Sequence, residues 1–449
     1  MDLNILTAIS PVDGRYRKST KRLAPYFSEY ALIKYRVYVE IKYYLALTEL
    51  PIALLNKLNK KQKADILQIF ETFDEKEALK VKEHEKKVNH DVKAIEYYIK
   101  EQFEKYHLSD YDEYVHFGLT SQDINNTAIP LLLKDCLNKE LLPKFTETLE
   151  LLKVLAHTWE DVPMLAHTHG QPASPTRMGK ELKVFIERIQ NQILQFENIP
   201  FSAKFGGATG NFNAHHVAYP DIDWVTFANE FVNIKLQLSR NQYTTQIEHY
   251  DNLGALCDVF KRIATIFIDL NRDIWEYISY DYFKQKVNKD EVGSSAMPHK
   301  VNPIDFENSE GNLGIAIALF QHLATKLPIS RLQRDLTDST VLRNLGVPFA
   351  HFYIAIDSLH KGLTKLTLNP TAINHDLENN WAVVSEAVQT ILRREGYPNP
   401  YEALKNLTRT GEKITRDTLH KFVDTLNIGQ NIKDELKAIT PFNYVGIVK

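Results

Sequence analysis

The sequence contains little cysteine, glycine or proline, and it has no long apolar run. Its two cysteines, Cys136 and Cys257, are too few for a disulfide framework or a cysteine zinc site, so we expect a reducing compartment, the cytoplasm. No apolar run approaches the roughly 18 residues of a membrane span, and the first residues lack the basic and apolar pattern of a secretory signal. Glycine and proline, at 17 and 18 residues of 449, make up about 8% of the chain, where roughly 12% is usual.

An excess of charge of either sign is also missing. The 54 lysines and arginines against 57 aspartates and glutamates leave a formal net charge of −3. A nearly neutral chain has no bulk attraction for nucleic acid or for an anionic membrane, so we predict neither as a partner. A local basic site for a small anion remains compatible with this balance, and the length is ample for a large buried core.

The sequence does have extensive helical periodicity. Apolar residues recur at helical spacing over residues 182–196 and, with no glycine or proline inside, over residues 256–278. The apolar stripe of 256–278 is wide, which is typical of a helix buried in a bundle. A further helix is predicted over 313–327, ending at Pro328. No alternating pattern indicates a major sheet, so the predicted fold class is all-α.

Three helical domains are expected from the way this pattern changes along the chain. Residues 1–110 contain shorter helices rich in lysine and tyrosine, and residues 111–362 contain the long helices of a central bundle. Residues 363–449 return to short helices separated by turns, most clearly at GYPNP, residues 396–400.

Four polar segments are not explained by helix packing. They are rich in histidine, serine, threonine, asparagine and glycine, and we predict that they are loops between long helices, where binding and catalysis concentrate. They are NHD (89–91), HFGLTSQDINN (116–126), HTHGQPASP (167–175) and GSSAMPHKVNP (293–303).

The last of these segments lies within a stretch of low hydrophobicity from about residue 286 to 312. Such a long polar stretch between bundle helices is uncommon unless it is functional or disordered. Ser294 supplies a hydroxyl, Lys300 a positive charge and Asn302 an amide. The segment is compatible with a loop that closes over an anion and places a serine to move a proton. Composition alone equally allows a surface loop without function.

Histidines occur in all four segments, and those of the first three are candidates for binding or proton transfer. His167 and His169 form an H-x-H pair, but no third metal ligand lies at local spacing, so a general acid is the more natural role. A hydrogen-bonded structural histidine is the alternative. His90 and His116 lie beside small polar residues, and Ser121 is expected to cap the helix that continues past residue 124. The open N–H groups of such a helix start suit a carboxylate.

Two further regions are candidates for binding. The glycine-rich residues 204–213 lack the Lys-Ser/Thr ending of a P-loop, so a tight turn that approaches a site is favoured over a phosphate cradle. The arginine-rich residues 331–343 suit phosphate or carboxylate, or else form a solvated charged surface. Arg15 and Tyr16 follow a turn near the N-terminus and are a third possible anion contact.

Taken together, the segments resemble the fumarase/aspartase superfamily, whose signature loop is GSS-x-MP-x-K-x-NP. Within it the chain resembles the adenylosuccinate lyase family, and His299 fits this family better than fumarase or argininosuccinate lyase. The resemblance extends over essentially the whole chain. The matching segments are SPVDGRYR (10–17), NHDVKA (89–94), HFGLTSQDINN, THGQPASP, TTQIEHYD (244–251), MPHKVNP and QRDLTDSTVLRN (333–344).

This resemblance implies a cofactor-independent β-elimination that releases fumarate. The implied substrates are adenylosuccinate, which yields AMP, and the succinylcarboxamide ribotide of purine synthesis (SAICAR), which yields AICAR. It also implies a homotetramer whose long helices form the core, with each active site built from loops of three subunits.

The resemblance also assigns roles to residues. Ser294 is the implied base, Ser295 holds substrate, and His169, with Thr168 beside it, is the implied acid. The residues implied at the succinyl end are Thr120, Ser121, Gln246, Lys300 and Asn302, with His116 near the base or the carboxylates. The residues implied at the nucleotide are Arg15, Tyr16, Asn89, His90, Asp91, Arg334, Ser339 and Arg343. No metal and no cofactor is implied.

Three other interpretations compete. Another lyase of the superfamily is the first, although the arginines of residues 331–343 favour a phosphorylated substrate. A non-catalytic relative is the second, and the presence of Ser294, His169 and Lys300 argues against it. A cofactor enzyme with a Schiff base on Lys300 is the third, and it would be coloured.

Overall fold

Helices form nearly all of the regular structure, which confirms the predicted fold class. The computed structural model describes residues 3–286, 301–408 and 413–447. Within these residues the strands are confined to three two-stranded pairs. No helix among them is both long and apolar enough to cross a membrane.

The chain divides into two compact units. The first contains residues 1–145, 192–265 and 311–357, and the second contains residues 146–191, 266–310 and 358–449. The expected division into three domains is a different partition and stays a prediction. The long helices contribute residues to both units: α8 (Leu142–Thr158), α9 (Met178–Glu197), α12 (Asp251–Ser279), α13 (Ile304–Lys326) and α15 (Gly346–Lys365).

Three of these long helices match the predicted ones. The periodic segments 182–196 and 256–278 lie inside α9 and α12, which confirms both predictions. Helix α13 covers the predicted 313–327 except its last residue, but it begins at Ile304, inside the stretch that looked like a polar loop. The polar side chains there have partners on neighbouring helices. Ser309, which is buried, accepts a hydrogen bond from Asn271 of α12 at 2.9 Å.

The first unit is built around α3 (Glu29–Leu47), a helix with neither glycine nor proline that begins at the N-cap Ser28. It packs against α4, α5, α6 and α7, and aromatic residues such as Tyr43, Phe205 and Phe231 fill the core beside it. The remaining helices of this unit are α1 (Arg17–Thr20), α2 (Ala24–Phe27), α4 (Lys60–Glu71), α5 (Glu75–Val88), α6 (Asp91–Lys105), α7 (Ser121–Cys136), α10 (Asn213–Ala218), α11 (Trp224–Asn229) and α14 (Thr337–Leu342). Strands β3 (Ser202–Ala203) and β4 (Ser239–Arg240) pair in parallel.

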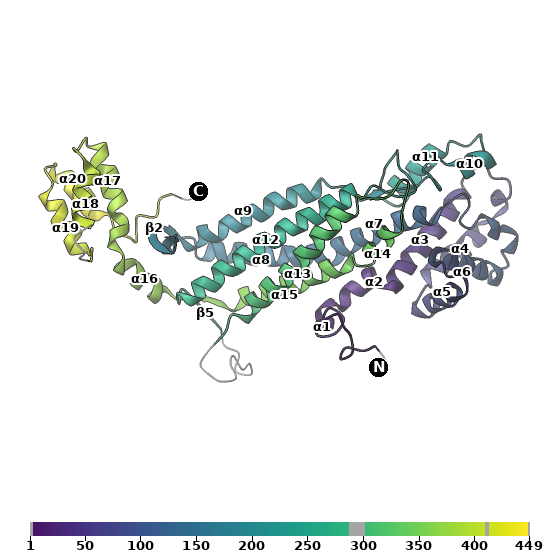
Figure 1. Cartoon of the computed structure of the whole chain (residues 1–449), viewed down its shortest axis with the longest axis horizontal. Coiled ribbons are helices and arrows are strands. Elements are labelled where there is room, and N and C mark those ends of the chain that lie inside the picture. Colours follow the sequence, from purple (N-terminus) through teal and green to yellow (C-terminus); the bar gives the residue numbers. More distant parts are fainter. Residues whose placement is uncertain (1–2, 287–300, 409–412, 448–449) are drawn as a thin grey trace. The chain divides into compact units, whose positions relative to one another are not determined.

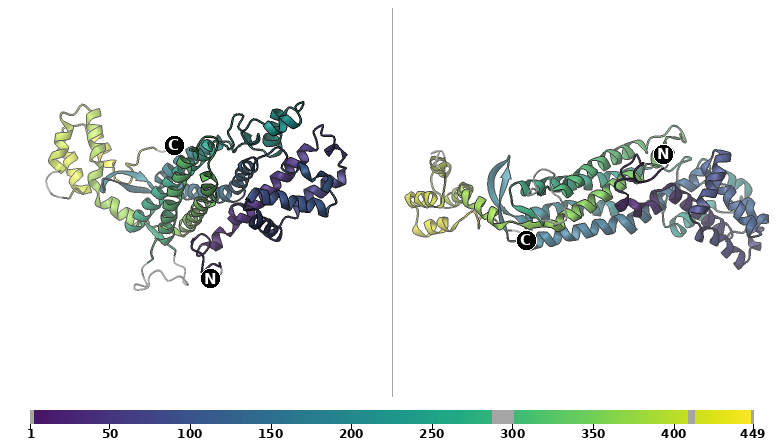
Figure 2. Two further views of the ribbon diagram at one scale, coloured as in Figure 1. Left: turned by 45° about the vertical axis from the view of Figure 1, so that its right-hand side comes forward. Right: turned by 90° about the horizontal axis from the view of Figure 1, so that it is seen from below.

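In the second unit, the segments of the long helices lie side by side (Figure 1). Strands β1 (Pro163–Thr168) and β2 (Gln171–Arg177) form an antiparallel hairpin (Figure 2). Strands β5 (Phe283–Gln285) and β6 (Leu366–Leu368) form a second antiparallel pair. The C-terminal helices are α16 (Pro370–Asn379), which contacts β1, and α17 (Ser385–Arg394), α18 (Pro400–Thr408), α19 (Arg416–Thr425) and α20 (Gln430–Ala438). The last four contribute to a small core around Trp381 and Val388.

Candidate active site

The NHD segment forms the junction between α5 and α6. Asn89 ends α5 in the left-handed region, with a φ of 52°. His90 is the N-cap of α6, and its Nδ1 accepts a hydrogen bond from the Lys93 N–H at 3.0 Å. Because Nδ1 is the acceptor, a neutral His90 ring carries its proton on Nε2. That Nε2 lies 3.5 Å from Ser121 Oγ, so His90 presents a donor toward the start of α7.

Asp91, the first residue of α6, is held between two arginines. Its Oδ2 accepts hydrogen bonds from Arg36 at 2.8 Å and from Arg343 at 3.2 Å. Arg36 is buried and also donates through Nε to Asn125 of α7 at 2.8 Å. Burial alone would raise the pKa of Asp91. The charge and hydrogen bond of Arg36, the hydrogen bond from the Val92 N–H and the charge of Arg343 together outweigh burial and lower that pKa. Asp91 therefore stays ionised and anchored.

The HFGLTSQDINN segment leads into α7. Thr120, and not Ser121 as predicted, is the N-cap, because its backbone is extended and its N–H donates to Asp123 Oδ2 at 2.8 Å. This leaves the Ser121 hydroxyl free of a capping role at the first turn of the helix. The open N–H groups at the start of α7 and the Ser121 hydroxyl together form a site that suits an anion.

A buried ion pair supports the start of α7 from behind. Asp123 and Lys204 both have side chains that are 0% exposed, and Lys204 Nζ lies 2.7 Å from Asp123 Oδ1. The same carboxylate accepts the N–H groups of Gly206 and Gly207 at 2.9 and 3.1 Å. The glycine-rich segment is thus a tight turn around a carboxylate of its own chain. Lys204 neutralises Asp123, so the buried charge does not cancel the positive end of α7.

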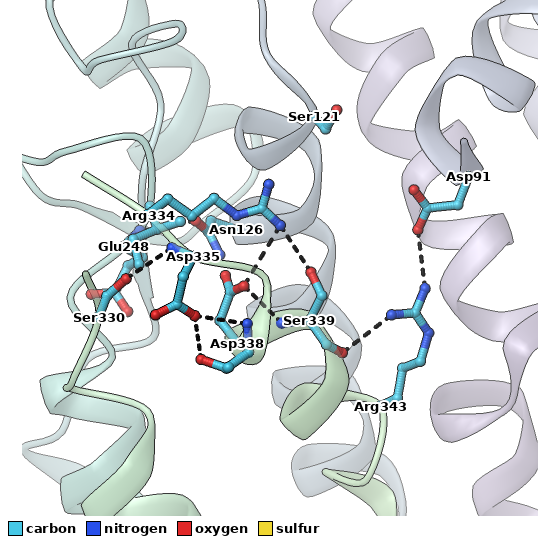
Figure 3. A network of polar contacts seen from close by, with 12 residues as sticks. Asp91, Ser121, Asn126, Glu248, Ser330, Arg334, Asp335, Asp338, Ser339 and Arg343 are labelled. Carbon is cyan, nitrogen blue, oxygen red and sulfur yellow. Dashed lines mark hydrogen bonds and ion pairs between the residues drawn. The ribbon is translucent and has the colours of Figure 1, made fainter. Parts of the chain in front are cut away.

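The arginine-rich segment around α14 provides the cations (Figure 3). Arg334 donates to Ser339 Oγ at 3.0 Å and lies 3.6 Å from Asp338 Oδ1. Arg343 donates to the Ser339 carbonyl oxygen at 3.2 Å while it also contacts Asp91. The segment is therefore ordered by its own contacts and is not a plain solvated surface.

These elements of the first unit enclose a pocket of about 290 Å³. Seven residues that the sequence analysis singled out line it, and they come from segments up to about 250 residues apart: Asn89, His90, Asp91, Ser121, Arg334, Ser339 and Arg343. The other lining residues are Glu85, Gln122, Asn125, Leu336 and Thr340. With two guanidinium groups, an imidazole donor, three hydroxyl-bearing residues and a helix start, this pocket can bind a phosphorylated, hydroxyl-bearing ligand.

His116 is placed differently. It adopts a φ of 60° and is not among the residues that line this pocket. Its Nδ1 lies 2.5 Å from Glu40 Oε1, and its Nε2 lies 3.9 Å from Glu96 Oε1. Burial lowers the pKa of His116, but the attraction and hydrogen bond of Glu40, followed by Glu96, outweigh it and raise that pKa. The implied role of His116 near the carboxylates stays a prediction.

Four further predicted residues of the first unit do not line the pocket, and one of them is the N-cap Thr120. Gln246 lies in the segment before α12, which is tied to α7 where the Glu248 N–H donates to Asn126 Oδ1 at 2.9 Å. Arg15 is exposed, and Tyr16 is the N-cap of α1.

The HTHGQPASP segment of the second unit is a hairpin and not a loop between helices. Thr168 pairs with Gln171, so His169 and Gly170 form a two-residue turn, and both have positive φ, 55° and 70°. These angles are typical of a type I′ turn, whose twist matches paired strands. Thr168 and His169 are exposed at the tip, whereas His167 packs at 5.0 Å from the ring of Tyr280. The His169 imidazole is thus exposed at the tip of a hairpin whose backbone conformation is set by the turn.

The signature loop is described only in part. Ser294, Ser295 and Lys300 lie outside the described residues, and Asn302 lies two residues before α13. Among the described residues no group of three histidine, cysteine, aspartate or glutamate side chains is arranged to hold a metal ion.

Several residues that hold the pocket were not found in the sequence. Gln122, Asn125 and Thr340 lie within segments that were singled out, so their neighbours were a usable signal. Arg36 lies in the middle of α3, where nothing distinguishes it from the other basic residues of that region. Only its burial and its contact with Asp91 identify it.

Comparison with known proteins adds to this geometry. Residues 14–317 match the family model described as Lyase, and residues 330–445 match the model described as Adenylosuccinate lyase C-terminal. The chain is 58% identical to adenylosuccinate lyase of Dictyostelium discoideum, over 100% of this chain and 98% of the relative. It is 45% identical to adenylosuccinate lyase of Escherichia coli strain K12, over 99% of this chain and 98% of the relative.

Solved structures share the fold at much lower identity. The fumarate lyase from Mesorhizobium sp. BNC1 has a TM-score of 0.75 at 18% identity and matches 95% of both chains. The 3-carboxy-cis,cis-muconate lactonizing enzyme from Pseudomonas putida has a TM-score of 0.74 at 19% identity, over 95% of this chain and 94% of that one. The two family models and the near-complete relatives together show that the chain belongs to the adenylosuccinate lyase family of fumarate-releasing lyases.

Proposed function

We propose that this chain eliminates fumarate from adenylosuccinate, leaving AMP, and from SAICAR, leaving AICAR. The observation that carries the proposal is the pocket of the first unit, which Arg334 and Arg343 line together with His90 and the start of α7. Both substrates are phosphate monoesters joined to a succinyl group. A pair of guanidinium groups beside hydroxyls and a helix start supplies the donors that a phosphate and a ribose require.

The reaction breaks one C–H bond and one C–N bond and forms a C=C bond. A base removes the proton from the succinyl carbon next to the distal carboxylate, the electron pair forms the double bond, and the nitrogen leaves with a proton from an acid. We assign the base to Ser294 and the acid to His169. Charge that develops on the carboxylate must be stabilised, and we assign this to Lys300 and Asn302, with Ser295 holding the substrate.

The start of α7 is proposed to bind the succinyl end. The Thr120 cap and the Ser121 hydroxyl flank the free N–H groups of this helix, and Gln246 and His116 are assigned to the same end of the substrate. Because Lys204 neutralises the buried Asp123, a carboxylate that docks here meets a positive field and no opposing charge.

The nucleotide end is assigned to the remaining residues. His90 donates from Nε2, because its Nδ1 is occupied by the Lys93 N–H. Thr168 is assigned beside His169, and Asn89 and Asp91 beside His90. Arg15, Tyr16, Arg334, Ser339 and Arg343 are assigned to the phosphate and ribose.

The assembly and setting are also proposed. We propose a homotetramer whose active sites are shared between subunits, with three helical domains per subunit at 1–110, 111–362 and 363–449, working in the cytoplasm without a cofactor, and binding neither nucleic acid nor membrane. Light scattering tests the oligomer directly, with four times the chain mass of 51.9 kDa expected. A particle of one or two chains that turns over at the full rate would contradict shared sites.

One assay tests the reaction. The purified chain is given adenylosuccinate, argininosuccinate or fumarate in separate reactions, and fumarate formation or loss is followed by absorbance. We expect turnover of adenylosuccinate, seen as the spectral change when the purine amine is freed, and none of the other two. Turnover of argininosuccinate alone would overturn the proposed substrate, and a coloured protein would revive a Schiff-base cofactor on Lys300.

A further inference from the structure

Three segments that carry candidate substrate contacts meet at a buried chain of hydrogen bonds. Asn126 belongs to α7, Tyr250 directly precedes α12 and Asp338 belongs to α14, and the three residues are 2%, 3% and 5% exposed. The Asn126 amide donates to the Tyr250 hydroxyl oxygen at 2.8 Å. That hydroxyl donates in turn to Asp338 Oδ2 at 3.0 Å.

One end of this chain reaches the pocket. Asp338 Oδ1 accepts the Ser339 N–H at 2.7 Å and lies 3.6 Å from Arg334 Nη2 (Figure 3). Arg334 and Ser339 both line the pocket. Asp338 is therefore the buried carboxylate behind two of the groups assigned to the nucleotide. Its other oxygen, Oδ2, accepts the hydrogen bond of the Tyr250 hydroxyl.

The other end holds the segment that carries Gln246. Asn126 Oδ1 accepts the Glu248 N–H at 2.9 Å, and Glu248 Oε2 accepts the Tyr250 N–H at 2.6 Å. Tyr250 has a φ of 62°, which is unusual for a residue with a side chain. Such a conformation persists only where the surroundings over-determine it. Contacts on both its main chain and its hydroxyl provide that constraint.

The hydroxyl is suited to be a donor. Burial, followed by the charge of Asp338, raises the pKa of Tyr250, so the phenol keeps its proton across the physiological range. A buried carboxylate that loses a donor is left with an uncompensated lone pair. Without the Tyr250 donor, we expect the Asp338 carboxylate to rotate toward Arg334 or toward solvent. The orientation of the Arg334 guanidinium then changes as well.

We infer that Tyr250 is a positioning residue: through Asp338 it holds Arg334 in the orientation that binds the phosphate monoester of the substrate, and through Asn126 it ties that orientation to the start of α7. The inference rests on the proposed function, because the phosphate assignment of Arg334 belongs to it. Tyr250 itself is not among the residues that line the pocket.

The first test removes one hydroxyl. Tyr250→Phe keeps the ring, and we expect KM for adenylosuccinate to rise about tenfold while kcat changes less than about threefold. Tyr98→Phe is the matched control. Tyr98 is also buried and donates to a carboxylate, Glu77 Oε2 at 2.8 Å, but it joins α5 to α6 outside the pocket lining. Its KM should not change. Equal KM values for wild type and Tyr250→Phe, with or without a lower melting temperature, would overturn the inference.

The second test asks whether the effect passes through Arg334. KM is measured for wild type, Tyr250→Phe, Arg334→Ala and the double variant. If Tyr250 acts through Arg334, adding Tyr250→Phe to Arg334→Ala changes KM less than about twofold. Independent effects that multiply would overturn the inference and leave the proposed function intact.

The two failures remain distinguishable. Absence of fumarate release by wild type counts against the proposed function alone. In that event the same four proteins are titrated with AMP by calorimetry, and the same non-additivity is expected in the dissociation constants. Additive losses of AMP affinity, or no AMP binding by wild type, would overturn the inference.

Discussion

The pocket of the first unit and the β1–β2 hairpin of the second unit place their candidate residues by opposite means. In the pocket, side chains are held by other side chains: Arg36 and Arg343 hold Asp91, and Asp338 stands behind Arg334. At the hairpin, the backbone alone determines where His169 lies, because this exposed residue is part of a two-residue turn with positive φ.

Because of this difference, a substitution affects function and stability separately at the hairpin but together in the pocket. An exposed residue at a hairpin tip contributes little to folding, so its replacement reports on chemistry. A pocket built on buried charges couples the two, because removal of one charge leaves its partner uncompensated. Substitutions can therefore test whether the two regions differ as described.

The largest expected effect is at the hairpin. His169→Ala should lower kcat by about 10²–10⁴-fold, the usual contribution of a general acid, with the melting temperature unchanged because the side chain is exposed. Steady-state kinetics and calorimetric melting on the same preparation check both parts. Ser294→Ala should lose as much kcat, with the tetramer intact. A near-normal kcat for His169→Ala, together with a strong loss for His167→Ala, would move the acid to His167.

The next effect is on stability and lies behind α7. Lys204→Met should lower the free energy of unfolding by about 3–5 kcal/mol, because Asp123 is left charged in a fully buried position. Urea denaturation measures it. Lys183→Met, which breaks the exposed pair of Lys183 with Glu160, is the control and should leave the midpoint unchanged. Adding Asp123→Asn to Lys204→Met should recover part of the loss, and a midpoint equal to wild type for Lys204→Met alone would contradict the role of the pair.

A pH dependence of up to about 3 kcal/mol is expected from His215. Burial, together with Lys204, lowers the pKa of His215 to about 4, against the opposing charge of Asp123, whereas an unfolded histidine titrates near 6.5. The unfolded chain therefore binds the extra proton first, and this group reduces stability as the pH falls from about 6.5 to about 4. His215→Gln should flatten that part of the stability curve, measured as urea midpoints against pH. His116, whose folded pKa is raised, has the opposite sign: its contribution is complete below about pH 6.5 and is lost as the pH rises through the folded pKa.

The smallest effect is on substrate affinity. Arg334→Ala should raise KM for both nucleotide substrates by about tenfold, with kcat within about threefold, since it removes a contact present in both ground and transition states. Arg331→Ala is the matched control, because Arg331 is an exposed arginine of the same segment paired with Asp335. An unchanged KM for Arg334→Ala would remove Arg334 from the phosphate site.

Much of the fold and part of the site followed from local patterns. The periodicity of 182–196 and 256–278 predicted α9 and α12, because apolar residues at this spacing lie on one face, and can be buried together, only in a helix. The polar segments and the arginine-rich region predicted the pocket-lining residues around Asp91, Ser121 and Arg334, because clusters of polar residues are not explained by packing into an apolar core. Prediction was less successful where side chains compete locally. The hairpin of HTHGQPASP and the Thr120 cap depended on turn angles and on Asp123, and α13 begins nine residues before its apolar pattern because its polar side chains find partners.

The sequence by itself determined that this is a helical protein with four polar segments rich in residues that can bind or catalyse, because periodicity and residue type act over a few neighbouring residues. The tertiary structure decided which residues support those segments. Arg36 carries no local signal, whereas Tyr250 and Asp338 lie in segments that the sequence singled out but are not themselves distinguished there. The roles of all three follow from burial, which makes every unpaired charge or hydrogen-bonding group costly and so fixes its partner across the fold.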